Sequence, residues 1–166
     1  MKYILDFDRT VFDMDALYEK IESVNPGVEV GTVESLKDIN LEELLFPDAL
    51  DFFSLQDQEN IQIVSSSFGL TGQWDLEYQK IKIEKSNVAQ YVSDVHVVAD
   101  SKISTIKRIA RNVDQAVYVD DHPEHVLNAM QHISGLTVVY INRKNEQPEI
   151  PGVKTIRSLA ELEGII

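Results

Sequence analysis

Apolar residues along the chain follow two alternating spacings, and each spacing predicts a different kind of element. Short apolar runs predict β-strands at 3–8, 60–64, 95–99, 116–119, 136–141 and 153–156. Apolar residues three or four positions apart predict helices at 14–24, 41–45, 47–53, 74–81, 91–92, 103–113, 126–133 and 158–166. Strands that alternate with helices are typical of a parallel sheet covered on both faces. The pattern therefore predicts an α/β fold, a Rossmann-like three-layer sandwich with a central parallel sheet.

Nothing in the pattern divides the chain. Its 166 residues suit one domain with a buried core, and we see no repeat, low-complexity segment or linker, so we predict a single domain over 1–166. Pro26-Gly27 is expected to end the first helix. An N-x-x-E capping pattern begins at Asn40, and Pro47 restarts a helix shortly after it. Residues 28–38 have no clear period and are expected to form a loop or a small flap.

Two carboxylates stand at the end of the first apolar run. Asp6 and Asp8 are two residues apart, so in a strand they would lie on one face, at the end where open α/β sheets bind ligands. Two crowded carboxylates repel each other, and a cation such as Mg²⁺ relieves the repulsion. Aspartate is also common in turns, so the pair alone fits either a metal site or two solvated turn residues.

Three later segments place polar side chains at similar points of the predicted fold. Ser65 and Ser66 follow the second predicted strand, and Lys102 opens a predicted helix. Asp120 and Asp121 follow the fourth predicted strand. Each segment also has an explanation without a functional role. Serine is common in turns, and a single lysine is usually solvated. An acidic residue at the start of a helix is stabilised by the helix dipole. Capping explains one of the two aspartates but not both.

In chain order, these four segments resemble the four motifs of the haloacid dehalogenase superfamily: D-x-D-x-T from Asp6, then the serine, the lysine and the paired aspartates. Most members of that superfamily are Mg²⁺-dependent phosphohydrolases. The resemblance spans roughly Tyr3 to Met130, and its specificity lies in the combination of the motifs. Arg9 stands where many members have glycine, and we expect this change to affect the shape or charge of the site entrance.

The resemblance implies a reaction on phosphate monoesters. Asp6 would be the nucleophile and would form an aspartyl-phosphate. Asp8 would protonate the leaving oxygen and then deprotonate the attacking water. The Ser65 hydroxyl and the Ser66 amide would bind phosphate oxygens, and Lys102 would pair with the phosphate and keep the nucleophile ionised.

The resemblance also implies how Mg²⁺ would be held. Its ligands would be the carboxylate of Asp6, the backbone carbonyl of Asp8 and an acid of the D-D motif. We expect Asp121 to bind directly, with Asp120 acting through water or by orienting Lys102. Which of the two aspartates binds the metal directly stays open.

The segment between the first and second motifs is longer than one helical crossover needs. From Asp8 to Ser65 there are 57 residues, and in the superfamily insertions at this point form caps over the active site. Here residues 11–45, about two short helices and a loop, are expected to form a minimal cap. Such an insert would leave the site fairly open.

Composition sets limits on partners and compartment. The chain has no cysteine, which excludes disulfides, thiolate nucleophiles and Cys-ligated zinc. With 28 acidic and 15 basic residues its net charge is −13, which opposes binding to nucleic acid. The N-terminal apolar run is broken by Asp6, so neither a signal peptide nor a membrane span is expected. We predict a cytoplasmic protein, with a monomer favoured and a phosphorylated small molecule as its substrate.

Several other polar and aromatic residues receive modest roles. Thr10 is expected to stabilise the loop after Asp8 by hydrogen bonding. His122 and His125 are three apart on a helix and, with no third nitrogen or sulfur ligand in view, are expected in surface or capping roles. Trp74 and Tyr78 are expected in the core, with Trp74 close enough to the Ser65 loop to line the entrance.

The sequence thus predicts a Mg²⁺-dependent phosphatase, with two alternatives. A phosphomutase or phosphotransferase uses the same constellation but generally needs a cap that excludes water, which the short insert disfavours. A protein that keeps the fold for binding without turnover is the other alternative, although every motif residue is present. The sequence does not identify the substrate.

Overall fold

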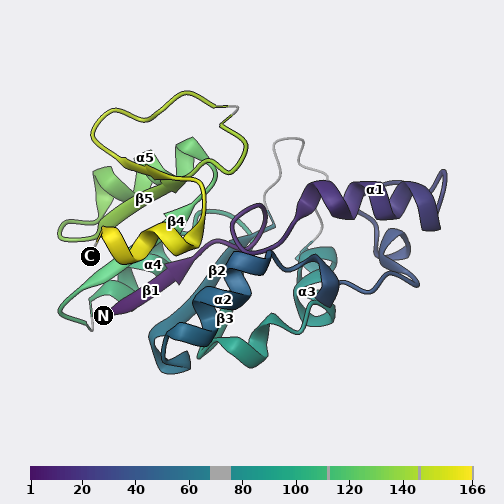
Figure 1. The fold of residues 1–166 in the computed structure, drawn as a ribbon, viewed down its shortest axis with the longest axis horizontal. Helices are drawn as coiled ribbons and strands as arrows, with labels where there is room; N and C mark the ends of the chain where they lie inside the picture. The colour runs from purple at the N-terminus through teal and green to yellow at the C-terminus, as the bar shows by residue number, and fades with distance from the viewer. Residues whose placement is uncertain (68–75, 112, 146, 166) are drawn as a thin grey trace.

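A six-stranded parallel sheet forms the centre of the molecule (Figure 1). The computed structural model describes residues 1–67, 76–111, 113–145 and 147–165. The strands are β1 (Lys2–Leu5), β2 (Ile61–Ser66), β3 (Asp94–Val98), β4 (Ala116–Asp120), β5 (Thr137–Ile141) and β6 (Lys154–Ile156). Their order in the sheet is β3-β2-β1-β4-β5-β6, and every neighbouring pair is parallel. The chain reverses its winding direction between β1 and β4, where open α/β sheets form a crevice at the carboxyl ends of their strands.

Helices connect these strands. The α-helices of the described residues are α1 (Met14–Val24), α2 (Pro47–Leu55), α3 (Leu76–Lys85), α4 (Ile103–Ala110) and α5 (Pro123–His132). Short 3₁₀ helices cover Val33–Leu36, Glu42–Leu44, Gln58–Asn60, Val88–Tyr91 and Leu159–Gly164. Local sequence explains where two of the α-helices begin: Asp13 accepts hydrogen bonds from the amides of Asp15 and Ala16 ahead of α1, and Pro47 occupies the first turn of α2.

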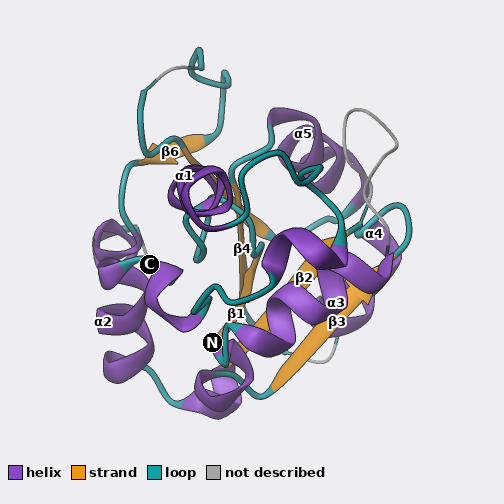
Figure 2. Ribbon diagram, turned by 90° about the vertical axis from the view of Figure 1, so that its right-hand side faces the viewer, coloured by secondary structure: helices purple, strands orange, loops and turns teal. Residues whose placement is uncertain are grey.

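Helices lie on both sides of the sheet (Figure 2), and successive residues of β1 pack into opposite layers. Tyr3 and Leu5 of β1 join a cluster with α2 and the last 3₁₀ helix, whereas Ile4 joins a cluster with α4 and α5. All three side chains are buried, as expected for a strand covered on both faces. The predicted three-layer α/β sandwich with a parallel sheet is therefore confirmed.

The insert predicted at residues 11–45 is closed at its base by backbone hydrogen bonds. The amide of Asp13 donates to the carbonyl of Leu44 at 2.8 Å, and the amide of Phe46 donates to the carbonyl of Val11 at 2.9 Å. Between these points α1 extends away from the sheet, and Figure 1 shows α3 beside the same region. The role of this insert as a cap, and the division of the chain as one domain, stay predictions.

Several elements differ from the sequence prediction. The first strand ends at Leu5, before both aspartates, and the chain turns at residues 9–11. The segments predicted as α-helices at 41–45 and 158–166 instead contain 3₁₀ helices. The second of these begins with a capping box, in which Ser158 caps the amide end and Glu161 reaches back to the amide of Ser158. Apolar residues spaced by three or four do not distinguish such short 3₁₀ helices from α-helices.

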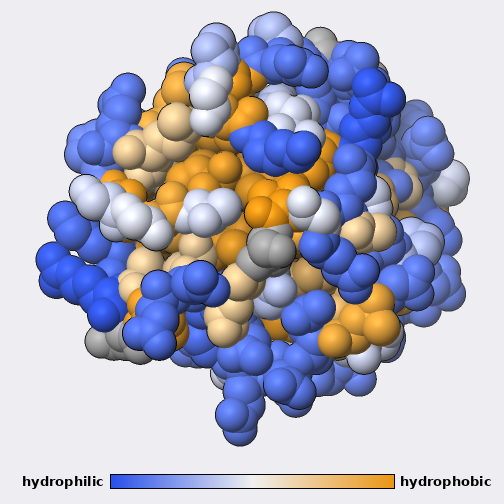
Figure 3. Space-filling view, turned by 60° about the vertical axis from the view of Figure 1, so that its left-hand side comes forward, coloured by the Kyte–Doolittle hydropathy of each residue, from blue (hydrophilic) through white to orange (hydrophobic). Residues whose placement is uncertain are grey.

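The surface is mixed in character. In Figure 3 the face brought forward carries an area of hydrophobic side chains within a largely polar surround. The basic residues Lys107, Arg108 and Arg111 are exposed on and just after α4 and belong to a solvated helix face. None of the helices in the described part of the chain combines the length and the apolar character needed to cross a bilayer. Oligomeric state, compartment and nucleic-acid binding stay predictions.

Candidate active site

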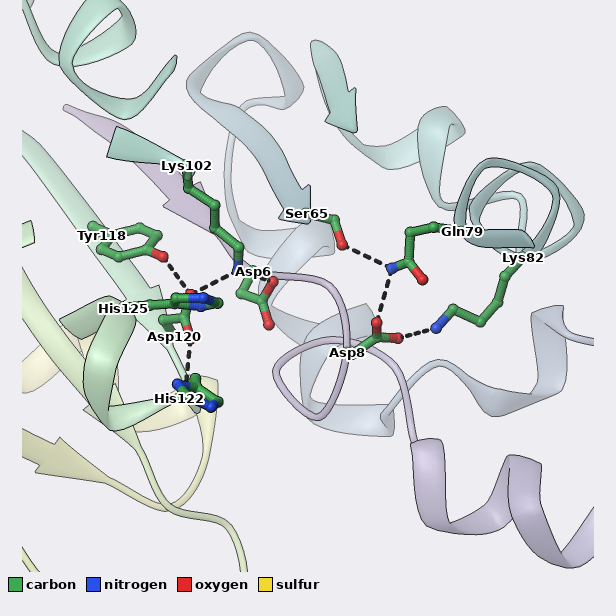
Figure 4. A network of polar contacts seen from close by, with 10 residues as sticks. All are labelled: Asp6, Asp8, Ser65, Gln79, Lys82, Lys102, Tyr118, Asp120, His122 and His125. Atoms are coloured by element: carbon green, nitrogen blue, oxygen red, sulfur yellow. Dashed lines mark hydrogen bonds and ion pairs between the residues drawn. The ribbon is translucent and has the colours of Figure 1, made fainter. Parts of the chain in front are cut away.

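The polar residues of the four motif-like segments meet at the carboxyl edge of the sheet (Figure 4). Asp6 follows β1, Asp120 ends β4 and Ser65 lies near the end of β2. Lys102 directly precedes α4. Because neighbouring parallel strands end at the same edge, residues far apart in sequence are brought within hydrogen-bonding distance there.

Lys102 bridges two of the aspartates. Its Nζ lies 2.5 Å from Oδ1 of Asp6 and 2.8 Å from Oδ2 of Asp120, and all three side chains are almost completely buried. Burial alone lowers the pKa of Lys102, but Asp120 and Asp6 outweigh it and raise that pKa above its usual range. Lys102 therefore remains a cation between two anions.

Asp120 uses both carboxylate oxygens within the protein. Besides Lys102, its Oδ2 accepts from the hydroxyl of Tyr118 and contacts Nδ1 of His125 at 3.2 Å, and its Oδ1 accepts from the amide of His122 at 2.8 Å. Burial raises the pKa of Asp120, but Lys102 and His125 outweigh it and hold that pKa well below its usual range. This carboxylate is fixed as an anion that orients Lys102.

The two histidines differ from their predicted roles. His125 is part of the Asp120 network, and its ring lies 4.7 Å from that of His122, centroid to centroid. His122 occupies the position before α5, but its side chain makes no capping hydrogen bond. Its buried Nδ1 has no hydrogen-bond partner among the described residues. The D-D motif itself gave the only sequence signal for these contacts, since His122 and His125 follow it by one and four residues.

Asp121 joins Asp6 and Asp120 in a group of carboxylates. One oxygen from each lies within 4.8 Å of the others. No described residue forms a hydrogen bond or ion pair with the Asp121 carboxylate, in contrast to Asp120. Burial, followed by the charges of Asp6 and Asp120, raises the pKa of Asp121 well above its usual range. Burial also raises the pKa of Asp6 to about 6, against the lowering effect of Lys102.

This group fits a magnesium ion. Hard oxygen ligands suit Mg²⁺, and a divalent cation would offset the burial and the mutual repulsion that raise the pKa values of Asp6 and Asp121. Because Asp120 is already bonded through both oxygens, Asp121 has the carboxylate that is open to a metal. The donor chemistry thus matches the predicted cofactor.

Asp8 faces a different part of the molecule. Its Oδ1 accepts from Nζ of Lys82 at 2.6 Å, and its Oδ2 accepts from Nε2 of Gln79 at 2.8 Å. Figure 4 shows this carboxylate directed towards α3, while Asp6 is directed towards Lys102. The expectation that the two carboxylates share one strand face is therefore wrong, because the strand ends at Leu5 and the two-residue alternation ends with it.

Ser65 is connected to Asp8 through α3. Its Oγ accepts from Nε2 of Gln79 at 2.8 Å, and its side chain is buried. Ser66 is the last residue of β2 and is half-buried. Gln79 and Lys82 are the site residues that the sequence analysis missed. Tyr78 is buried in the core, as predicted, but the apolar spacing from Tyr78 to Ile81 did not indicate that Gln79 and Lys82 are buried as well. Trp74, predicted near the entrance, lies outside the described residues.

The loop after Asp8 is held by its backbone. Thr10 is completely buried, but its hydroxyl has no hydrogen-bond partner among the described residues. Instead, the carbonyls of Thr10 and Arg9 accept from the guanidinium of Arg143, at 2.6 and 3.1 Å. Thr10 therefore takes part in the hydrogen bonding of this loop through its carbonyl. Arg9 has a φ of 57° and donates to Asp15 at 3.2 Å.

A cleft opens beside the carboxylates. Its volume is about 720 Å³, and its lining includes Asp121, His122, Arg9, Asp13 and Lys144. The position of Arg9 in this cleft agrees with the expectation that it affects the charge of the site entrance.

Comparison with solved structures gives matches over nearly the whole chain. A HAD phosphatase from Thermococcus onnurineus is 20% identical, with a TM-score of 0.64 over 99% of this chain and 97% of that one. An L-2-haloacid dehalogenase from Xanthobacter autotrophicus is 11% identical, with a TM-score of 0.66 and the same two coverages. The N-terminal part of a Bacteroides fragilis protein, containing a phosphatase domain complexed with Mg, is 21% identical, with a TM-score of 0.54. That match covers 97% of this chain and 38% of the other.

No protein-family profile and no curated protein sequence matches the chain. At these identities the structural likeness establishes the fold, and the chemistry has to be argued from the site. Sheet order, motif order and structural neighbours agree with the resemblance seen in the sequence. The chain has the fold of the haloacid dehalogenase superfamily.

Proposed function

We propose that the protein is a Mg²⁺-dependent phosphatase that hydrolyses phosphate monoesters through an aspartyl-phosphate on Asp6. The observation that supports this most is the buried pair of Asp6 and Lys102, with a carboxylate oxygen of Asp6 within 4.8 Å of those of Asp120 and Asp121. One lysine neutralises part of this charge, and a phosphate ester would bring more negative charge. A divalent cation and a phosphoryl group together suit the arrangement.

The nucleophile would be the Asp6 oxygen that is not bonded to Lys102. It would attack phosphorus as the bond to the leaving oxygen breaks, and Asp8, which must be protonated in the substrate complex, would give that oxygen its proton. In the second step Asp8 would take a proton from water as the water oxygen attacks phosphorus. The bond to Asp6 would then break and inorganic phosphate would leave.

Charge around the phosphoryl group would be balanced by groups on several strands. Lys102 would pair with a phosphate oxygen, and the Ser65 hydroxyl and Ser66 amide would donate to others. The carboxylates of Asp6 and Asp121 and the carbonyl of Asp8 would hold Mg²⁺. When bound, the ion would neutralise charge on the phosphoryl oxygens.

The acidic cluster favours phosphate esters over haloacids, although one structural neighbour is a haloacid dehalogenase. Attack of a carboxylate on a carbon–halogen bond releases one halide and needs no divalent cation. Asp121, with no partner among the described residues, would repel both the carboxylate of a haloacid and the departing halide. A divalent cation would balance the charge of this residue.

The cleft supports a small phosphorylated metabolite as substrate. Its volume, about 720 Å³, is in the range of small-molecule sites, and it opens beside Asp121. A phosphomutase would need to keep water away from the phosphoenzyme, and the short insert at 11–45 makes that less favourable. We therefore place hydrolysis ahead of transfer to a second hydroxyl.

The test is phosphate release from para-nitrophenyl phosphate by the metal-stripped protein, with and without Mg²⁺. We expect turnover only with Mg²⁺, loss of turnover in EDTA, and inhibition by Ca²⁺, whose larger and looser shell misplaces the nucleophile. Asp121→Asn should raise the Mg²⁺ concentration needed for half-maximal rate at least about 10-fold, since a ligand is removed. Asp114→Asn, an exposed acid just before β4, is the control and should change nothing. Full activity in EDTA would refute the proposal.

A further inference from the structure

Two residues of α3 hold the carboxylate of Asp8, and the mechanism above gives neither of them a role. Lys82 donates to one oxygen at 2.6 Å and Gln79 donates to the other at 2.8 Å. Both side chains have no exposed surface. They lie more than 70 residues from Asp8 in sequence, so the contacts are made by tertiary packing alone.

The position of Lys82 is fixed by its surroundings. Its Nζ lies 5.9 Å from the ring centroid of Phe7, 5.8 Å from that of Phe12 and 5.3 Å from that of Tyr78. The sulfur of Met14 lies 3.3 Å away. Aromatic faces attract an ammonium group, and a buried lysine cannot sample the rotamers of a solvated one. The ion pair with Asp8 is therefore held in one geometry.

The orientation of Gln79 follows from its partners. The Asp8 carboxylate only accepts hydrogen bonds when ionised, so the amide nitrogen must face it. The same nitrogen donates to Oγ of Ser65 at 2.8 Å. Because Ser65 accepts this bond, its own proton remains available to a further acceptor, which in the proposed site is a phosphate oxygen.

The side-chain oxygen of Gln79 does not use its capacity to accept a hydrogen bond from a described residue. This oxygen, Oε1, is buried. A buried amide that leaves its acceptor unused is destabilising, and such groups are kept where another constraint requires the side chain. The bridge between Asp8 and Ser65 is that constraint.

We propose that Gln79 and Lys82 are positioning residues that fix the Asp8 carboxylate beside the phosphate site and join it to Ser65. The inference rests on the proposed phosphatase function, because it assigns the acid–base role to Asp8. Lys82 anchors one oxygen from the side of α3. Gln79 sets the distance between the acid–base group and the hydroxyl that binds phosphate.

The test is a double-mutant cycle in turnover of para-nitrophenyl phosphate. Lys82→Met and Gln79→Met keep the side-chain length and remove the donors. Each should lower kcat about 10-fold to 100-fold, the usual effect of a small misplacement of a catalytic group. In an Asp8→Asn background the group they position is no longer an acid or base, so the same substitutions should change kcat less than about 3-fold.

The two variants should also differ from each other. Gln79→Met should raise both KM and the inhibition constant for inorganic phosphate, because Ser65 loses its partner. Lys82→Met should leave both near the wild-type values. Lys80→Met, an exposed lysine on the same helix, is the matched control and should behave as wild type in every assay. If thermal unfolding shows that Lys82→Met does not fold, the double-mutant cycle is measured with Gln79→Met alone.

The outcomes separate the inference from the function on which it rests. Equal losses in the wild-type and Asp8→Asn backgrounds, with an active wild type, would overturn the positioning role and leave the phosphatase proposal intact. A wild-type protein that hydrolyses no phosphate monoester would overturn both. Losses that disappear in the Asp8→Asn background would support the inference, since a purely structural role would add to every background.

Discussion

Two buried lysines hold the two aspartates that follow β1, and they do so in different electrostatic settings. Lys102 contacts two carboxylates, those of Asp6 and Asp120, and these raise its pKa in spite of burial. Lys82 pairs with the carboxylate of Asp8 among the described residues, and burial outweighs this pairing and lowers the pKa of Lys82. Aromatic rings surround the second lysine, whereas carboxylates surround the first.

The difference indicates which side of the site needs a further cation. Around Lys102 the carboxylates of Asp6, Asp120 and Asp121 exceed the positive charge of the lysine. Among the described residues, the ammonium of Lys82 is ion-paired with the carboxylate of Asp8, and the charges of this pair balance. We call the group of Asp6, Lys102, Asp120 and Asp121 the Asp6 side, and the group of Asp8, Gln79 and Lys82 the Asp8 side. Binding of Mg²⁺ and attack on phosphate should depend on the Asp6 side. The Asp8 side should supply a proton, and its carboxylate should not bind the metal.

Asp6→Asn should give the largest effect on activity. The variant keeps the size of the side chain but removes the attacking charge, so we expect kcat to fall by at least about 10⁴-fold. No phosphoenzyme should be recovered after an acid quench of the variant with substrate. Asp8→Asn serves as the comparison. If Asp6→Asn retains activity while Asp8→Asn has none on any substrate, the roles assigned to the two aspartates are reversed.

Asp8→Asn should lose less activity than Asp6→Asn, and the size of the loss should depend on the substrate. The nucleophile is intact but the acid–base group is gone, which usually costs about 10²–10⁴-fold in rate. With para-nitrophenyl phosphate the leaving group needs little protonation, so the first step should suffer less than with an alkyl phosphate. Phosphoenzyme should then accumulate, because water attack still lacks its base. Equal losses on both substrates, without trapped phosphate, would contradict an acid role for Asp8.

The sequence predicted the Asp6 side because its residues stand at the ends of strands. Buried apolar runs fix where β1 and β4 lie, so Asp6 and Asp120 had to reach the same edge of the sheet. Lys102 follows from the start of an amphipathic helix. The choice between Asp120 and Asp121 was not readable from sequence, since it depends on which carboxylate Tyr118 and Lys102 occupy.

The Asp8 side was not predicted, for a related reason. Asp8 lies beyond the end of β1, where strand alternation no longer sets the direction of a side chain. Gln79 and Lys82 are polar residues at buried positions of α3. Hydrophobic spacing instead predicted that Ile81 is buried, and Ile81 is only half-buried. A buried polar residue gains its partner through tertiary packing, and single-sequence patterns do not contain that information.

Replacing Lys102 or Lys82 by methionine should lower the free energy of unfolding by different amounts. Lys102→Met leaves two almost completely buried carboxylates without their cation, and we expect the free energy of unfolding to fall by about 3–5 kcal/mol. Lys82→Met leaves Asp8 bonded to Gln79, with its side chain 28% exposed, so a smaller loss of about 0–2 kcal/mol is expected. Urea unfolding of the metal-free variants measures both. A larger loss for Lys82→Met would show that the charge balance has been assigned to the wrong side.

The smallest predicted effect is a shift in the titration of Asp6. In the metal-free protein, burial, opposed by Lys102 and reinforced by Asp120, raises its pKa from 3.8 to about 6. The folded state then binds more protons than the unfolded state between these values. This group alone therefore makes the free energy of unfolding fall as pH rises through that window.

Mg²⁺ favours the ionised carboxylate of Asp6, so it should lower the pKa of Asp6. The carboxyl ¹³C shift of Asp6, assigned with Asp6→Asn, would report the titration with and without Mg²⁺. Asp121→Asn should reduce the shift caused by Mg²⁺, whereas Asp114→Asn should leave it unchanged. A metal-free pKa near 4, or no response to Mg²⁺, would contradict the unbalanced charge on the Asp6 side.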